Sequence, residues 1–171
     1  MSRAAAAVSP AELPGQALLA RYGRDGGYAD CYTTVLPRPV SLAEFVEAFY
    51  TTRLFRLERW LLARLGHAST DEQARQLAAG ERERFAAWTV EGRAPDQLLL
   101  CDAVGGTRSW LMVAPAEGGG TRLHFGSAVV PRRRGPGQRP RMGVLFHALL
   151  GFHRAYSRAL LRAAWRRLGE R

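Results

Sequence analysis

The sequence predicts an α+β domain in which a curved antiparallel sheet of about five strands wraps around a long C-terminal helix. Three observations predict this class. Runs of β-forming residues alternate with glycine and proline turns, capped helical segments follow the first run, and residues 141–168 carry apolar side chains at helical spacing. Strands joined by short turns are antiparallel, and helices on one face of such a sheet give an α+β fold.

The N-terminal residues 1–12 are small or interrupted by proline, which predicts a disordered segment. Residues 13–171 contain no linker and no internal repeat, so we expect them to form a single domain. A short helix is expected over residues 13–22. The first strand is expected over residues 28–36, whose sequence YADCYTTVL is rich in aromatic and β-branched residues.

Capping signals place the next helices. Ser41 and Glu44 have the spacing of a capping box, in which each side chain bonds the other residue's backbone N–H. A second helix is expected over residues 54–65. A third, capped by Thr70 with Gln73 or by Ser69 with Glu72, continues to about residue 79.

Four further strands are expected after these helices. The Gly105-Gly106 pair between two of them is a strong signal for a two-residue hairpin. The other turns are also short, so consecutive strands pair with each other. The predicted strands are residues 84–91, 97–103, 107–114 and 121–130.

The final helix is predicted to be amphipathic, because large apolar residues recur on one face and arginines on the other. A stripe of this width needs a broad apolar partner, and the sheet is the candidate. The apolar face carries Leu145, Leu149, Phe152, Tyr156, Leu160 and Ala163, flanked by Phe146, Leu150, Leu161 and Leu168. The opposite face carries Arg154, Arg158, Arg162 and Arg166.

Three short motifs accompany this element order: Tyr28-Ala29-Asp30, Ser127-Ala128-Val129-Val130, and Phe152-His153-Arg154 followed by Leu160-Leu161. The order resembles a reduced form of the helix-grip fold of the START-like, or polyketide-cyclase-like, superfamily. That resemblance implies a sheet that wraps the last helix, often with a cavity between them. Over residues 28–168 the motifs resemble a family known only as a domain of unknown function in that superfamily, which implies no catalytic residues.

Pairing the hairpins on paper assigns the sheet faces. Closing the Gly118 to Gly120 loop with Ala114 opposite Thr121 sets Trp110 opposite Phe125, on a face with Trp88 and Met112. We place this aromatic face against the final helix. It either fills the core completely or lines a pocket for an apolar or aromatic ligand.

The second face of the predicted sheet is also partly apolar. Leu98, Leu100, Leu111 and Val113 form a patch there, and an exposed patch of this kind usually marks an interface. The sequence therefore favours a homodimer through this face.

Polar candidates complete the predicted ligand set. Arg108 at one end of the aromatic face either binds an anionic group bidentately or extends into solvent. His153 and Tyr156 on the final helix either contact a ligand or act as acid and base, and the alternative for His153 is a hydrogen-bonded core histidine. The predicted ligand-binding residues are Trp88, Arg108, Trp110, Met112, Phe125, His153 and Tyr156.

No catalytic or metal-binding residue and no cofactor is assigned from the sequence. Asp102, Ser109 and His124 can be drawn as a triad, but Ser109 lies mid-strand without a nucleophile elbow. The cysteines Cys31 and Cys101 are too few for a disulfide scaffold. With neither a signal peptide nor an apolar run of membrane-spanning length, the sequence predicts a cytoplasmic protein.

The net charge of +10 raises the question of an anionic partner. The densest basic patch is a proline- and glycine-rich loop containing Arg132, Arg133, Arg134, Arg139 and Arg141. No aromatic residue accompanies it to stack on bases. A solvated loop is therefore favoured over contact with nucleic acid or an anionic membrane.

These observations favour a protein that binds a small apolar or aromatic ligand, with or without an anionic group, between the sheet and the final helix. One alternative is a cyclase- or aromatase-type enzyme that uses His153 or Tyr156. A second is a basic adaptor that contacts nucleic acid or membrane through residues 131–141.

Overall fold

The computed structural model describes residues 7–24, 27–130 and 144–170, without the side chains of Arg24 and of residues 144–150. The chain forms an α+β fold built on one antiparallel sheet with the strand order β1-β2-β7-β6-β5-β4-β3. Its strands are β1 (Ser9–Pro10), β2 (Tyr28–Leu36), β3 (Arg84–Phe85), β4 (Trp88–Ala94), β5 (Gln97–Asp102), β6 (Thr107–Pro115) and β7 (Thr121–Val129). Its helices are α1 (Ala20–Arg24), α2 (Leu42–Tyr50), α3 (Arg53–Arg64), α4 (Asp71–Ala79) and α5 (Val144–Gly169), with a 3₁₀ turn η1 (Glu117–Gly119).

The sheet has seven strands within the described residues, so the prediction of about five was too low. One addition is β1, which pairs with β2 although it lies in the segment predicted to be disordered. The other arises because residues 84–91 are not one strand. Ala86 has a φ of 51°, and the chain turns there so that Phe85 pairs with Trp88. The turn divides the predicted strand into β3 and β4.

The predicted helix caps are confirmed. Ser41 and Glu44 form a capping box at α2, and Thr70 and Gln73 form one at α4. Thr52 caps α3, because its hydroxyl accepts a hydrogen bond from the N–H of Phe55. Caps depend on local spacing, so the sequence is sufficient to place them. The helix predicted over residues 13–22 is shorter and later, at Ala20–Arg24.

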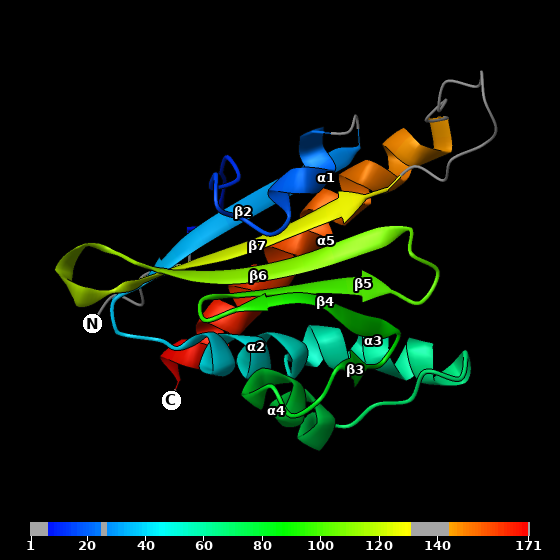
Figure 1. Cartoon of the computed structure of the whole chain (residues 1–171), viewed down its shortest axis with the longest axis horizontal. Helices are drawn as coiled ribbons and strands as arrows, with labels where there is room; N and C mark the ends of the chain where they lie inside the picture. Colours follow the sequence, from blue (N-terminus) through cyan, green and yellow to red (C-terminus); the bar gives the residue numbers. More distant parts are fainter. Residues whose placement is uncertain (1–6, 25–26, 131–143, 171) are drawn as a thin grey trace.

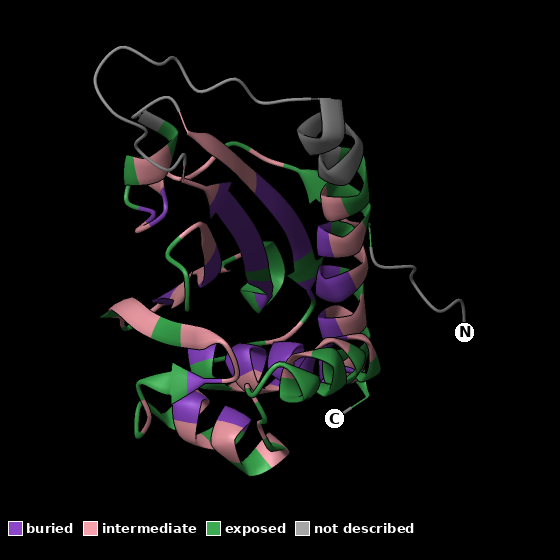
Figure 2. Ribbon diagram, turned by 90° about the vertical axis from the view of Figure 1, so that its right-hand side faces the viewer, coloured by how far each residue is buried: buried purple, intermediate pink, exposed green. Residues whose placement is uncertain are grey.

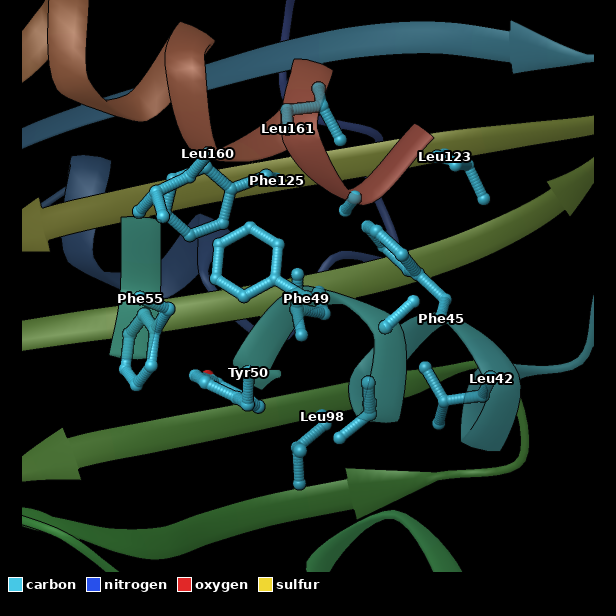
Figure 3. Packing of buried hydrophobic residues seen from close by; sticks show 14 of the residues in the cluster. Leu42, Phe45, Phe49, Tyr50, Phe55, Leu98, Leu123, Phe125, Leu160 and Leu161 are labelled. Carbon is cyan, nitrogen blue, oxygen red and sulfur yellow. The ribbon is translucent and has the colours of Figure 1, made fainter. Parts of the chain in front are cut away.

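Two layers cover the sheet, one on each face. Helices α2 to α5 cover the face that holds the main core, where the ring centroid of Phe49 in α2 lies 4.7 Å from that of Phe125 in β7. Figure 3 shows these rings packed beside Leu160 and Leu161 of α5. The segment that contains α1 covers the opposite face (Figure 1), where Leu19 is fully buried in a smaller core.

The strand registers overturn the predicted faces. Thr121 pairs with Pro115, not Ala114, and this shift of one residue sets Leu111 opposite Phe125 and Trp110 opposite Gly126. A shift of one residue moves a strand's side chains to the opposite face. Trp110 and Met112 therefore pack under the N-terminal segment and not against the helices.

The apolar patch predicted for a homodimer is not exposed. Leu98, Leu100 and Leu111 belong to the main core and are at most 1% exposed, and Val113 packs against that core. The helices cover the face that was expected to pair with a second copy. The surface on which the homodimer prediction was based is therefore not exposed.

The inner face of α5 differs in part from the predicted stripe. Leu160, Leu161 and Leu168 are buried, as expected, but Phe152 is 69% exposed. Arg154, Arg158, Arg162 and Arg166 are exposed, as predicted. The predicted residues Leu145, Phe146, Leu149 and Leu150 have side chains outside the described set. Within the described residues, no helix has the length and the apolar run needed to cross a bilayer.

Candidate functional site

Residues from the three sequence motifs meet at one place in the fold. Asp30 lies in β2, Ser127 in β7 and His153 in α5, and strand pairing sets Asp30 directly opposite Ser127. The Ser127 hydroxyl lies 2.7 Å from Oδ1 of Asp30 and 2.6 Å from Nε2 of His153. We call these three residues the Asp30–Ser127–His153 cluster. It joins the long helix to the face of the sheet that α2 to α5 cover, which we call the concave face. Figure 2 shows the curved strands beside that helix.

The Asp30 carboxylate is held from both sides. Its Oδ1 accepts from the backbone N–H of Ser127 at 3.1 Å as well as from the Ser127 hydroxyl. Its Oδ2 accepts from the Tyr28 hydroxyl at 2.9 Å. Arg154 adds a cation, since its Nε donates to the Tyr28 hydroxyl at 3.1 Å. Burial raises the pKa of Tyr28 to about 12, so this phenol stays a donor at neutral pH.

The hydrogen bonds fix the tautomer of His153. A carboxylate only accepts, so the Ser127 hydroxyl proton points to Asp30. Nε2 of His153 therefore donates its proton to the Ser127 oxygen. In this tautomer Nδ1 carries no proton and is an acceptor. The imidazole is 35% exposed, whereas Ser127 is 5% exposed. The cluster is thus a buried anchor with one accessible edge.

This arrangement is not a Ser-His-Asp catalytic triad. In a triad the carboxylate holds the histidine nitrogen that faces away from the serine. Here Oδ2 of Asp30 lies 3.9 Å from Nε2, the same nitrogen that bonds Ser127. Because Asp30 bonds the serine directly, the histidine is not oriented as a base for Ser127.

A row of polar groups crosses the concave face from this cluster. Ser109 in β6 pairs with Ser127, and its hydroxyl lies 3.3 Å from the hydroxyl of Tyr50 in α2. Tyr50 is 1% exposed, and burial raises its pKa. The row therefore consists of neutral hydroxyls flanked by one carboxylate and one imidazole.

Aromatic side chains surround the polar row. Trp88, Phe125 and Tyr156 belong to the main core or pack against it, and Trp88 and Tyr156 remain partly exposed. The Tyr156 hydroxyl donates to Glu58 of α3 at 2.5 Å, and Phe152 stacks on the Tyr156 ring with centroids 6.0 Å apart. Burial beside Glu58 raises the pKa of Tyr156.

Two buried polar atoms near this surface have no hydrogen-bond partner among the residues that the structure describes. One is the indole nitrogen of Trp88, and the other is the hydroxyl of Ser157, one helical turn from His153. Ser157 is fully buried. Buried polar groups are nearly always paired, so each of these atoms needs an explanation.

Three predicted ligand residues lie on the opposite face, because of the register shift. Arg108 pairs with Glu91, with its Nε 2.5 Å from Oε2, and its guanidinium carbon lies 4.7 Å from the ring centroid of Tyr22. The Trp110 indole donates to Gln97 at 3.0 Å, and Met112 is buried beside it. The predicted single wall is therefore wrong: Arg108, Trp110 and Met112 are separated by the sheet from Trp88, Phe125, His153 and Tyr156.

The imagined triad of Asp102, Ser109 and His124 does not form. Asp102 accepts from Thr107 at 2.5 Å, while His124 packs near Cys31, with Nδ1 3.9 Å from Sγ. In the described part of the chain, no group of three or more His, Cys, Asp or Glu residues is placed to hold a metal ion. The basic loop with Arg132, Arg133, Arg134, Arg139 and Arg141 lies outside the described residues.

A second surface feature is an open groove of about 650 Å³. It is lined by parts of the β2–α2 connection and of the β6–β7 hairpin. Half of its lining residues are proline, glycine or alanine, and Glu44 and Asp96 are its acidic residues. Glu44 already serves the α2 capping box. The groove gathers no group of reactive side chains.

Comparisons with protein-family models, curated proteins and solved structures found no match to this chain. The role of the site is therefore inferred from its own geometry. Asp30 and Ser127 lie within the sequence motifs, but no role was predicted for either residue. Glu58 was not a predicted site residue. The missing information was the pairing of β2 with β7, which no local pattern specifies.

Proposed function

We propose that the protein binds a small, largely apolar or aromatic molecule on the concave face of its sheet, beneath α5. Trp88, Phe125 and Tyr156 provide apolar surface, and His153 provides the polar contact. In this proposal the architecture is a reduced helix-grip fold of START-like type. The seven-stranded antiparallel sheet with a long C-terminal helix packed on it supports that assignment.

The observation that carries the proposal is the partly exposed imidazole of His153 beside a buried polar row. Nε2 is occupied by Ser127, so a ligand would use Nδ1. Nδ1 accepts a hydrogen bond when the ring is neutral and donates one when it is protonated. A ligand hydroxyl, carbonyl or anionic group can therefore be held at this point while its apolar part contacts aromatic rings.

The unpaired atoms of Trp88 and Ser157 support the same proposal. An indole N–H only donates, and a hydroxyl both donates and accepts. A ligand with one or two polar atoms would satisfy groups that otherwise carry a desolvation cost of ~1–3 kcal/mol each. Such a pattern of few polar groups in an aromatic surface is typical of small-molecule sites.

The chemistry of the same residues favours binding over the cyclase-type alternative. Burial and the neighbouring Glu58 raise the pKa of Tyr156, which moves its phenol away from the range of a general base at neutral pH. His153 donates to a serine whose own proton is directed at Asp30. Neither residue is arranged to take a proton from a substrate through Ser127.

Titration with the fluorescent probe 8-anilinonaphthalene-1-sulfonate, which combines aromatic rings with an anionic group, tests the proposal. His153→Leu is expected to weaken probe binding by up to about tenfold, because the probe's anilino N–H loses its acceptor Nδ1 and one such hydrogen bond contributes ~0.5–1.5 kcal/mol. His67→Leu, in the α3–α4 connection, is the matched control and should bind as the wild type does. Equal affinities for the two variants would contradict the proposal.

A further inference from the structure

Helix α3 presents an exposed apolar stripe to solvent. Leu57, Trp60, Leu61 and Leu65 are between 50% and 74% exposed and follow one another at helical spacing. Figure 1 shows α3 continuing from α2 toward the edge of the molecule, on the outside of the helical layer. We call these four residues the α3 stripe.

The exposed charged side chains of α3 itself all have one sign. Arg53, Arg56 and Arg64 are exposed, and no acidic side chain is exposed between residues 53 and 65. The one acidic residue of the helix, Glu58, turns inward and accepts from Tyr156. The guanidinium carbon of Arg64 lies 3.5 Å from the ring centroid of Trp60, so the cation and the aromatic ring form one surface. Arg56 forms an ion pair with Asp71.

The stripe is held rigidly from behind. Phe55 is 3% exposed in the main core, and Arg59 is 8% exposed. Arg59 donates to Asp71 at 2.6 Å and to the carbonyl of Ser69 at 2.8 Å. The buried face of α3 is therefore fully engaged, and the apolar outer face is not explained by loose packing of the helix.

We propose that the α3 stripe docks on an anionic lipid surface. An interfacial helix places leucine and tryptophan side chains at the headgroup boundary and keeps arginines beside them for anionic headgroups. The net charge of +10 adds long-range attraction to such a surface. This inference is independent of ligand binding. It also reverses the preference against a membrane partner, which was based on residues 131–141.

Charge argues against a second copy of the chain as the occupant. A two-fold interface brings the same patch of both subunits together. Arg53 and Arg64 of one copy would then face the same arginines of the other, without an exposed acidic residue on the helix to pair with them, whereas Arg56 is already paired with Asp71. An anionic lipid surface offers the complementary charge.

Co-sedimentation with vesicles of equimolar phosphatidylcholine and phosphatidylglycerol tests the inference. The double variant Leu57→Gln/Leu61→Gln keeps every charge and should bind at least about tenfold more weakly than the wild type, because two apolar side chains no longer enter the interface. Val104→Gln, at a residue that is 70% exposed in the β5–β6 turn, is the matched control and should bind as the wild type does. All three altered side chains are more than half exposed, so the variants should fold.

Three results would overturn the inference. In the first, the wild type does not bind the vesicles. In the second, the double variant binds them as tightly as the wild type does, which would assign binding to charge elsewhere. Analytical ultracentrifugation without lipid is the third check. A wild-type dimer that becomes a monomer in the double variant would assign the stripe to a second copy.

Discussion

The Ser127 hydroxyl lies 2.6 Å from Nε2 of His153, and this contact ties the last strand of the sheet to the long C-terminal helix. The same hydroxyl donates to Asp30 on the neighbouring strand. One serine therefore links three elements that are distant in the sequence. This contact adds to the apolar packing of Leu160 and Leu161 that holds α5 against the sheet.

Replacing Ser127 with alanine should lower the free energy of unfolding by ~1–3 kcal/mol, because the buried Asp30 carboxylate loses a donor and His153 loses its acceptor. Urea denaturation measures the loss. Ser157→Ala is the matched control, since that hydroxyl is equally buried but has no partner in the described residues. A loss for Ser157→Ala as large as that for Ser127→Ala would contradict the assigned hydrogen bonds.

Glu58 should make stability depend on pH. Burial raises the pKa of Glu58, and the hydrogen bond from Tyr156 offsets part of that shift. The folded protein then keeps a proton that the unfolded chain has lost, so the free energy of unfolding falls as the pH rises from the ordinary glutamate pKa to the raised one. Glu58→Gln cannot titrate, and it should gain stability relative to the wild type across that interval.

Urea denaturation at about pH 4 and about pH 7 checks this prediction, since the ordinary glutamate pKa lies near the lower value. Glu72→Gln is the control, because the Glu72 side chain is 67% exposed. A Glu58→Gln variant whose stability follows the wild type at both pH values would show that Glu58 is not buried as described.

Gly126 should not tolerate a side chain. A Cβ there would lie 2.7 Å from the Asp30 carbonyl oxygen and 3.0 Å from Cε3 of Trp110. Gly126→Ala should therefore destabilise the protein by ~1–3 kcal/mol. Gly151→Ala, where nothing lies within 4 Å in α5, should instead stabilise it by about 1 kcal/mol. Thermal denaturation measures the melting temperature of each variant. Equal changes in melting temperature would contradict the packing of β7.

Leu19 tests the layer formed by the N-terminal segment. Its side chain is fully buried beside Trp110, so Leu19→Ala should cost ~2–5 kcal/mol. Leu57→Ala, at an exposed position of α3, should cost less than ~0.5 kcal/mol. Similar chemical denaturation midpoints for the two variants would mean that the segment does not cover the sheet.

The sequence was sufficient for features set by local chemistry. The capping boxes of Ser41 and Thr70 and the strand at Tyr28–Leu36 are found where they were predicted. The sheet faces were not predictable, because Pro115 pairs with Thr121 at the end of β6 although proline usually ends a strand earlier. That one residue moved Trp110 to the other face.

The candidate site was predictable only in part. Trp88 and Phe125 were predicted from the aromatic pattern of the strands, and His153 and Tyr156 as polar groups on the apolar side of the final helix; all four lie on the same side of the sheet. Asp30 joins them because β2 pairs with β7, strands separated by most of the chain. A contact across that distance leaves no periodic signal in the sequence.

A crystal structure of the protein with bound 8-anilinonaphthalene-1-sulfonate tests the central claim most directly. Our account predicts the probe on the concave face beneath α5, with its anilino N–H donating to Nδ1 of His153 and its rings against Tyr156 or Trp88. A crystal structure in which the probe is bound at another surface, or is not bound at all, would contradict it.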